Sequence, residues 1–231
     1  MSETLVEARG MSAGYGKMAV VREVDIRVDA GEVVALIGAN GAGKTTTLLT
    51  LAGELAPMAG EVSFLGEPTR APMHVRCQKG LGYVTEGRSV IMDMSVADNL
   101  KLAAVDPTVA FGYFPALEPL MGRSAGLCSG GEQQMLSLAR ALGRNPKVLL
   151  ADELSLGLAP IIVANLLMAV RAAADERGVG VLLVEQHVRQ ALKIADRVHV
   201  MERGRIVLSG TANEVVGQLD KIESAYLAGG T

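Results

Sequence analysis

The segment from Gly38 to Thr45 constrains the fold more than any other part of this sequence. It reads Gly-Ala-Asn-Gly-Ala-Gly-Lys-Thr and matches the phosphate-binding pattern G-x-x-x-x-G-K-S/T. An apolar, β-branched run at 33–37 precedes it, and a helical pattern begins near Lys44. Glycines let backbone N–H groups surround phosphate oxygens where a helix N-terminus adds partial positive charge. The context therefore favours a strand, a phosphate-binding loop and a helix over an ordinary glycine-rich turn.

Each position in this loop has a predicted contact with a nucleotide. Lys44 is expected to reach the β- and γ-phosphates, and the Thr45 hydroxyl to ligate Mg²⁺. The predicted nucleotide-binding set in this region is Gly38, Ala39, Asn40, Gly41, Ala42, Gly43, Lys44, Thr45 and Thr46. ATP and Mg²⁺ are the expected ligands.

Two adjacent carboxylates, Asp152 and Glu153, follow a second apolar run at 148–151. In wound α/β folds, nucleotides bind at the carboxyl edge of the sheet, where such residues lie. We expect Asp152 to hold Mg²⁺ directly or through water, and Glu153 to polarise the attacking water. An apolar run followed by Asp-Glu is a weak signal alone, but together with the phosphate loop it is strong.

A second candidate anion site begins at Ser129, where the sequence reads Ser-Gly-Gly-Glu-Gln-Gln. Ser129 and Glu132 have the spacing of a helix capping box. Gly130 and Gly131 would be costly at the start of a helix unless a ligand approaches the backbone closely. No second phosphate site is evident within one chain, so this helix end is available to a partner's nucleotide.

The apolar patterns predict an α/β fold. Runs at 33–37, 148–151 and 179–184 are typical of buried parallel strands. Alternating residues at 24–29 predict a strand with one wet face, which suggests an antiparallel sheet near the N-terminus. Further strands are expected at 60–65 and around 198–207, where Arg203-Gly204-Arg205 makes the turn.

A proline-interrupted stretch predicts small helices inserted into this frame, over about 88–142. No linker or repeat appears, so a single domain over 1–231 is preferred. The expected architecture is a mixed sheet with an antiparallel N-terminal β-subdomain and an inserted helical subdomain.

Composition excludes other classes. The net charge of −3 comes without a basic block, so we expect no nucleic-acid partner. The longest apolar run, Leu156 to Val170, is shorter than the roughly 18 residues that span a bilayer, which favours a buried helix. Cys77 and Cys128 lack zinc or disulfide spacing. The first ten residues lack the apolar core of a signal peptide, so the expected location is cytoplasmic.

The phosphate loop, the segment 129–133 and the Asp152-Glu153 strand end together resemble the ATP-binding cassette (ABC) ATPases, over essentially the whole chain. The resemblance implies a P-loop NTPase fold of ABC type. Further segments are similar to the second ATPase subunit of branched-chain amino acid importers: Tyr15-Gly16-Lys17, Leu36–Lys44, Glu86-Gly87-Arg88, Ser155–Pro160, Val184-Glu185-Gln186 and Ser224–Leu227.

The resemblance implies roles for matching residues. Tyr15 would stack on adenine. Ser129, Gly130 and Gly131 would bind the γ-phosphate held by a partner ATPase, in a head-to-tail dimer that buries two ATP molecules. The segment 155–160 would be the D-loop, which crosses that interface. The implied partners are transmembrane permease subunits, a sister ATP-binding subunit or a second copy of this chain, and indirectly a solute-binding protein. The implied location is peripheral, on the inner face of the membrane.

Four positions depart from the family pattern. Cys128 replaces the leading Leu of the Ser-Gly-Gly motif, and Leu154 replaces the Pro that normally follows the acid pair. Glu86 stands at the Q-loop glutamine, where it can approach Mg²⁺ through water. The switch position, usually His, falls on Gln186, while His187 is one residue late and is favoured as a surface residue. We therefore assign the γ-phosphate contact to Gln186, beside Lys44 and Glu153 in the predicted catalytic set.

The segment 86–99 joins the predicted sheet to the helical insertion and lies where the resembled family docks its membrane subunits. It contains two charged residues that look exposed and three apolar ones: Arg88, Asp93, Met92, Met94 and Val96. Adaptable Met side chains near a few charges suit a groove for a partner helix. Alternatively, these Met residues fill the core beneath the insertion, and the sequence does not separate the two interpretations.

The leading functional hypothesis is the ATP-hydrolysing subunit of an importer for branched-chain or related amino acids. An ATPase of a urea or short-amide importer is an alternative, because the ATPase never touches the solute. A soluble cassette ATPase without a transport role is a weaker alternative. A P-loop kinase does not explain the segment 129–134.

Overall fold

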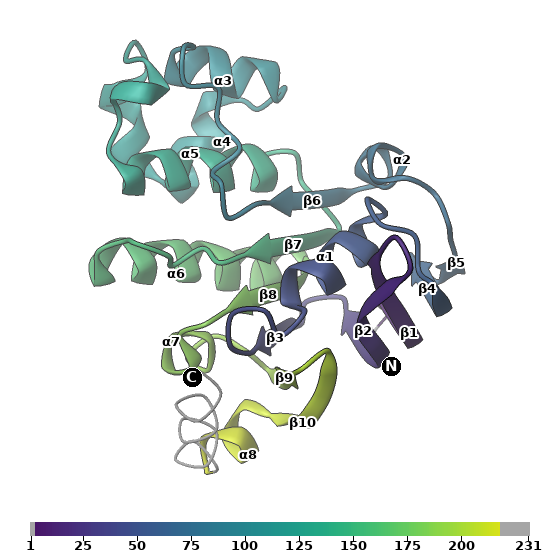
Figure 1. Ribbon diagram of the computed structural model, residues 1–231. Coiled ribbons are helices and arrows are strands. Elements are labelled where there is room, and N and C mark those ends of the chain that lie inside the picture. The colour runs from purple at the N-terminus through teal and green to yellow at the C-terminus, as the bar shows by residue number, and fades with distance from the viewer. Residues whose placement is uncertain (1–2, 218–231) are drawn as a thin grey trace.

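The computed structural model describes residues 3–217 (Figure 1). The predicted Ser224–Leu227 motif lies outside the described residues. Two sheets organise the fold, a four-stranded one in the order β2-β1-β4-β5 and a six-stranded one in the order β10-β9-β3-β8-β7-β6. The strands are β1 (Thr4–Tyr15), β2 (Met18–Asp29), β3 (Val33–Ile37), β4 (Ala59–Phe64), β5 (Glu67–Pro68), β6 (Leu81–Val84), β7 (Val148–Asp152), β8 (Gly180–Glu185), β9 (Arg197–Glu202) and β10 (Arg205–Thr211).

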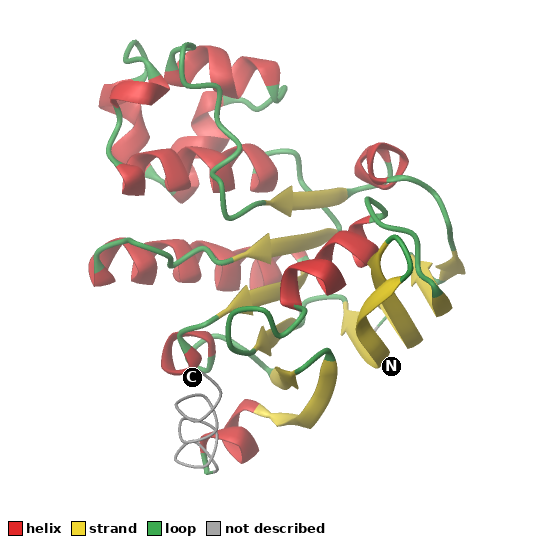
Figure 2. Ribbon diagram, in the orientation of Figure 1, coloured by secondary structure: helices red, strands yellow, loops and turns green. Residues whose placement is uncertain are grey.

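The helices lie on both sides of the larger sheet (Figure 2). The α-helices are α1 (Lys44–Ala52), α2 (Met73–Gln78), α3 (Val96–Leu102), α4 (Pro107–Tyr113), α5 (Gly130–Leu142), α6 (Pro160–Arg177), α7 (Val188–Ala191) and α8 (Ala212–Val216). Two short 3-10 helices are η1 (Pro115–Leu120) and η2 (Ala125–Leu127). No helix within residues 3–217 combines the length and apolar character needed to cross a membrane.

The pairing confirms a mixed sheet beside an antiparallel one. Strands β9, β3, β8, β7 and β6 run parallel, and β10 adds to β9 antiparallel at the edge. The smaller sheet pairs β1 with β2 and β4 antiparallel. In β3, β7 and β8 every residue is buried, which explains their unbroken apolar runs, because both faces of the sheet are covered.

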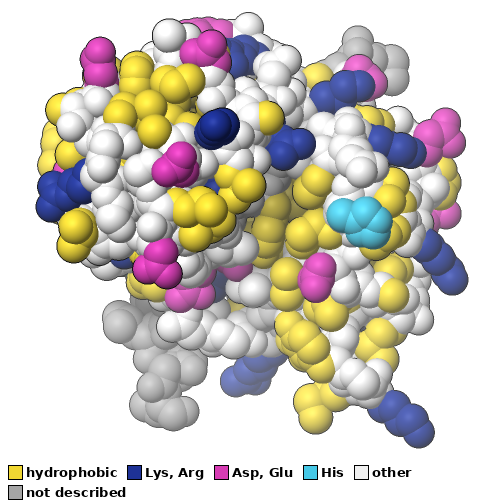
Figure 3. All heavy atoms as spheres, turned by 90° about the horizontal axis from the view of Figure 1, so that it is seen from above, with side chains coloured by type: hydrophobic (Ala, Val, Ile, Leu, Met, Phe, Trp, Pro, Cys, Tyr) yellow, Lys and Arg dark blue, Asp and Glu magenta, His cyan; other side chains and the backbone are white. Residues whose placement is uncertain are grey.

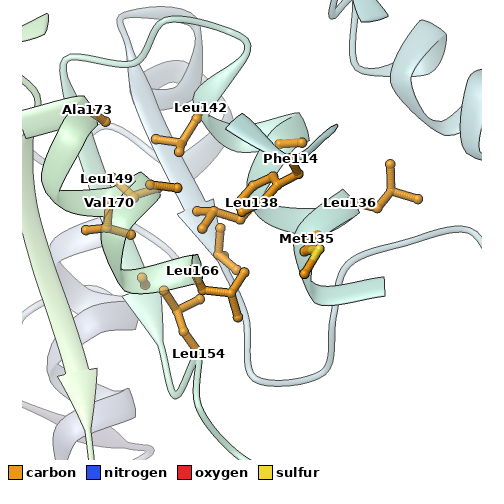
Figure 4. Close-up of a cluster of buried hydrophobic side chains, with 14 of the residues drawn as sticks. Phe114, Met135, Leu136, Leu138, Leu142, Leu149, Leu154, Leu166, Val170 and Ala173 are labelled. Atoms are coloured by element: carbon orange, nitrogen blue, oxygen red, sulfur yellow. The ribbon is translucent and has the colours of Figure 1, made fainter. Parts of the chain in front are cut away.

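Alternate side chains of these strands pack into two hydrophobic cores, one on each face of the larger sheet. Leu150 and Leu182 point to the core that contains α1 and the smaller sheet, whereas Leu149 and Leu183 point to the core formed with the helical segment. Figure 4 shows the second core, where side chains from α5, α6 and β7 meet. The ends of the parallel strands are thus fixed from both sides, and the predicted site residues follow those ends.

The chain between β6 and β7 holds the predicted insertion. Over 88–142 it contains α3, α4, α5, η1 and η2. In Figure 1 these helices lie above β6, away from the N-terminal strands. The division into one domain with an inserted helical subdomain stays a prediction.

The buried helix expected over Leu156–Val170 is wrong in extent, and its burial is confirmed for one face only, which carries Val163, Leu166, Leu167, Ala169 and Val170. The helix α6 starts at Pro160, because proline lacks an N–H and suits the first helical position. The residues before it form a loop. Ile161 and Met168 are exposed, because the helix lies on the sheet with one face toward solvent.

Candidate nucleotide-binding site

The phosphate loop follows β3 directly and is confined on two sides. Gly41 and Gly43 have φ of 78° and 107°, a region that favours glycine. A Cβ on Gly38 would lie 2.6 Å from the Met201 carbonyl oxygen, and one on Gly43 would lie 3.0 Å from a Val21 methyl. The loop therefore keeps its turn only with small residues at these positions, as the sequence pattern predicted.

Lys44 is folded back onto the loop. Its Nζ donates to the carbonyl oxygens of Gly38 at 2.8 Å and Ala39 at 3.2 Å, and it lies 3.5 Å from Oε1 of Glu153. The side chain is almost completely buried. A buried ammonium group needs such partners. Phosphate oxygens entering the loop would compete with the two carbonyls for this group.

The acid pair lies at the end of β7, as predicted. Glu153 adopts φ of 48° and donates its N–H to the Val184 carbonyl, so the chain turns sharply here. Oδ1 of Asp152 is buried and has no hydrogen-bond partner among the described residues. Burial raises the pKa of Asp152 to about 6, and the Glu153 and Glu86 carboxylates add to the rise, while Thr45 and Lys44 oppose it.

This donor set fits a magnesium ion. Within residues 3–217, no three His, Cys, Asp or Glu side chains are grouped to hold a metal. Mg²⁺ characteristically takes only one or two carboxylates and completes its shell with water and substrate phosphates. The unpartnered oxygen of Asp152 beside the Thr45 hydroxyl suits that coordination.

Gln186 connects the end of β8 with the acid pair and the phosphate loop. Its Nε2 lies 2.8 and 2.9 Å from the two carboxylate oxygens of Glu153 and 2.5 Å from Oδ1 of Asn40. His187 is exposed and precedes α7. The geometry brings the switch-position glutamine, rather than the neighbouring histidine, to the candidate catalytic carboxylate.

These residues surround a cavity of about 460 Å³, a size typical of small-molecule sites. Nine of its lining residues are in the predicted site: Asn40, Gly41, Gly43, Lys44, Thr45, Thr46, Glu86, Glu153 and Gln186. The two others, Val20 and Leu156, were missed. Both are apolar, so nothing distinguished Val20 from a core residue, while Leu156 lies in the predicted D-loop.

Val20 reaches the cavity through a contact that the sequence pattern did not indicate. Gly204, in the β9–β10 turn, donates its N–H to the Ala42 carbonyl at 2.9 Å. Its own carbonyl accepts from the N–H of Arg22 at 2.8 Å. A Cβ on Gly204 would collide with the Val20 carbonyl. This glycine therefore joins the N-terminal sheet closely to the phosphate loop.

The remaining predicted residues lie outside the cavity lining. Tyr15 is exposed at the β1–β2 hairpin. At the start of α5, Ser129 N–H donates to Glu132 Oε2 at 2.6 Å and Glu132 N–H donates to Ser129 Oγ at 3.3 Å, so the expected capping box forms. The chain does not bring this second candidate anion site to its own phosphate loop.

Arg88 differs from its predicted exposed position. It is half-buried, and its Nη1 lies 3.4 Å from Oε1 of Gln133 in α5. A Cβ on Gly130 would lie 2.9 Å from the same nitrogen. The first glycine of the helix thus leaves room for the arginine against the helix start.

Comparisons with known proteins agree with this geometry. The family model described as ABC transporter matches residues 21–155. The chain is 41% identical to the high-affinity branched-chain amino acid transport ATP-binding protein BraG of Pseudomonas aeruginosa, over 95% of this chain and 97% of that protein. It is 36% identical to the probable branched-chain amino acid transport ATP-binding protein LivF of Archaeoglobus fulgidus, over 89% and 92% of the two chains.

Similarity extends to an export-system ATP-binding protein and to solved structures. The lipopolysaccharide export system ATP-binding protein LptB of Acidithiobacillus ferridurans is 36% identical, over 94% of this chain and 93% of that protein. A crystal structure of the ADP conformation of an ATP-binding cassette has a TM-score of 0.87 at 23% identity, covering 99% of both chains, which shows a shared fold. The chain belongs to the ATP-hydrolysing, ATP-binding subunits of ABC transporters.

Proposed function

We propose that this subunit hydrolyses ATP to power import of branched-chain or related amino acids through partner permease subunits. The observation that carries the proposal is end-to-end similarity to BraG, a branched-chain amino acid transport ATP-binding protein, at 41% identity over 95% of the chain. The similarity to an export ATPase is lower, at 36%. The subunit would work on the cytoplasmic side of the membrane, bound peripherally to its permease.

The cavity residues suit hydrolysis of the γ-phosphate bond. Backbone N–H groups of the loop and Lys44 would hold the phosphates. Thr45 and Asp152 would hold Mg²⁺, with Glu86 approaching through water, and the ion when bound neutralises phosphate charge. Glu153 would accept a proton from the attacking water, and Gln186 would orient that carboxylate beside the γ-phosphate.

The site would be completed by a second ATP-binding subunit. Ser129 caps a 13-residue helix that begins with Gly130 and Gly131, and none of these three residues lines the chain's own nucleotide cavity. In a head-to-tail dimer, this helix end would bind the γ-phosphate held by the partner. The partner would be a sister subunit or a second copy, and Tyr15 would stack on adenine at the outer end of each site.

A groove beside the helical segment suits a permease segment. It has a volume of about 580 Å³ and is lined by residues of α2, β6, α3 and α5. Seen from above, the surface is hollowed between the helical lobe and the lobe that carries α2, with hydrophobic side chains along the hollow (Figure 3). Every charged residue in its lining is basic: Lys79, Arg140, Arg144 and Lys147. An amphipathic segment with acidic residues would complement it.

Two methionines of the predicted docking segment 86–99 are exposed. Met92 and Met94 are 43% and 39% exposed, so the interpretation that they fill the core is wrong for both. Val96 is fully buried and does belong to the core. Exposed, flexible Met side chains are suited to contact with a partner helix.

Replacing both Met92 and Met94 by Ser should weaken capture of the membrane subunits by about tenfold, because the contact area of two apolar side chains is lost. Binding of ATP to the isolated subunit should not change. Met168→Ser is the matched control, since Met168 is 61% exposed on α6. Capture would be measured by co-purification at graded salt and detergent. If both variants capture the membrane subunits equally well, Met92 and Met94 do not belong to the docking surface.

Uptake by cells tests the transported solute. In the organism that encodes this chain, replacing it with its Glu153→Gln variant should abolish high-affinity uptake of labelled leucine, because the permease loses its energy source. Loss of labelled urea or acetamide uptake with intact leucine uptake would favour the alternative importer. If no solute uptake changes, an import role is wrong, and an export or non-transport ATPase becomes the better description.

A further inference from the structure

We propose that Glu185 is a positioning residue. It binds Ser155 through two hydrogen bonds and thereby holds Glu153 in its strained, productive backbone conformation. The inference rests on the proposed function, because it concerns how the same site hydrolyses ATP. Glu185 does not line the nucleotide cavity, so it would act only through the loop that it holds.

Both carboxylate oxygens of Glu185 accept hydrogen bonds from Ser155. Oε1 of Glu185 accepts the Ser155 backbone N–H at 3.2 Å, and Oε2 accepts the Ser155 hydroxyl at 2.5 Å. Glu185 is 1% exposed and Ser155 is 4% exposed. Two hydrogen bonds in a buried place fix both the position and the orientation of the loop that starts at Ser155.

Glu153 is held on both sides by the end of β8. Its own N–H donates to the Val184 carbonyl at 2.9 Å, and two residues later Ser155 is bound by Glu185. Between these points Glu153 adopts φ of 48°, which is unfavourable for a residue with a Cβ. Such a conformation persists only where the surroundings impose it. The contact between Glu185 and Ser155 is one of the contacts that can impose it.

Glu185, the last residue of β8, and Gln186, which follows it, contact different residues. Gln186 points to the carboxylate of Glu153, as described above, whereas Glu185 points to Ser155. Leu154 adds no backbone restriction, while a proline there would restrict the residue before it. In this chain the turn therefore depends on hydrogen bonds.

A structural role alone explains Glu185 poorly. Within residues 3–217, it forms no ion pair with a basic side chain. Its pKa is raised to about 7, chiefly by burial; the two hydrogen bonds from Ser155 lower it, and the nearby Glu153 and Asp152 carboxylates raise it. Burying an acid near two others opposes folding, and an apolar side chain at the end of this buried strand would not.

Three variants of the full-length chain test the role of the contact between Glu185 and Ser155. Glu185→Gln can still accept the Ser155 N–H and can donate to its hydroxyl, so kcat should stay within about threefold. Glu185→Met fills the space without an acceptor. Its kcat should fall roughly ten- to hundredfold, with ATP affinity within about twofold, because a small misplacement of a catalytic group has such effects. Adding Ser155→Ala to Glu185→Met should reduce kcat no further, since the two residues act through one contact.

Hydrolysis would be measured as phosphate release, and affinity by equilibrium binding of a fluorescent ATP analogue. Near-normal kcat in Glu185→Met, or a parallel loss of affinity and kcat, would overturn the inference. An equal loss of kcat in Glu185→Gln and Glu185→Met would also overturn the inference. If Glu185→Met does not fold, Ser155→Ala compared with Ser155→Thr carries the test, because only threonine keeps the hydroxyl. All readouts use ATP alone, so the outcome is independent of the transported solute. Inactivity of the unmodified chain, both alone and with its partner subunits, would instead refute the proposed hydrolysis.

Discussion

Glu153→Gln is expected to reduce ATP turnover by about 10²- to 10⁴-fold, the usual contribution of a positioned general base. The amide keeps the shape of the side chain but neither accepts a proton nor attracts the water as a carboxylate does. Gln186 can still donate to the remaining carbonyl oxygen, so the local geometry should survive. ATP affinity should stay within about threefold, because Glu153 contributes to the transition state more than to ground-state binding.

Turnover would be followed as phosphate release by the transporter assembled with its membrane subunits. Glu118→Gln serves as the control, because Glu118 is an exposed carboxylate in η1. This variant also loses one negative charge, but far from the cavity lining. Near-normal turnover in Glu153→Gln would show that another group activates the water, and Asp152 would be the next candidate.

Local patterns were sufficient to predict the parts of the site that belong to one segment. The phosphate loop follows from glycine, lysine and threonine at fixed spacing. The acid pair follows from a buried strand that ends at the edge of the sheet. The capping box at Ser129 and Glu132 is likewise a property of four successive residues. In each case, backbone geometry over a few residues determines the result.

Contacts between distant segments could not be predicted in the same way. Val20 lines the cavity because Gly204 joins β2 to the phosphate loop, and Ser155 meets Glu185 because β7 and β8 pair in one register. Lys44 binding to loop carbonyls also depends on burial. None of these depends on residue spacing alone. They follow from strand order, register and packing, which one sequence does not specify by pattern.

At the start of α5, a contact with a distant residue adds a second explanation for the glycine at position 130. Glycine at 130 was explained by the approach of a ligand. The structure adds that Arg88 occupies the space where a Cβ would be. The arginine side chain is flexible at its far end, so a small side chain at 130 can be accepted if the guanidinium shifts slightly. This makes position 130 suitable for testing charge separately from size.

Gly130→Asp should prevent the dimer that ATP is expected to induce in the Glu153→Gln background. It would put a carboxylate against the γ-phosphate of the partner's nucleotide, and such like-charge contacts cost several kcal/mol, which weakens association by at least about 100-fold. The helix itself should tolerate the change, because an acidic residue is favourable in the first turn. The measurement is the sedimentation or sizing profile with and without Mg-free ATP.

Gly130→Ala is the matched control, because it adds the same Cβ beside Arg88 without the charge. If alanine and aspartate disrupt the dimer equally, the effect comes from the arginine contact rather than from phosphate binding. A dimer that forms equally well without nucleotide would contradict the proposal in a different way, since association would then depend on protein contacts alone. Loss with aspartate and retention with alanine would support a phosphate held between the loop of one subunit and the helix start of the other.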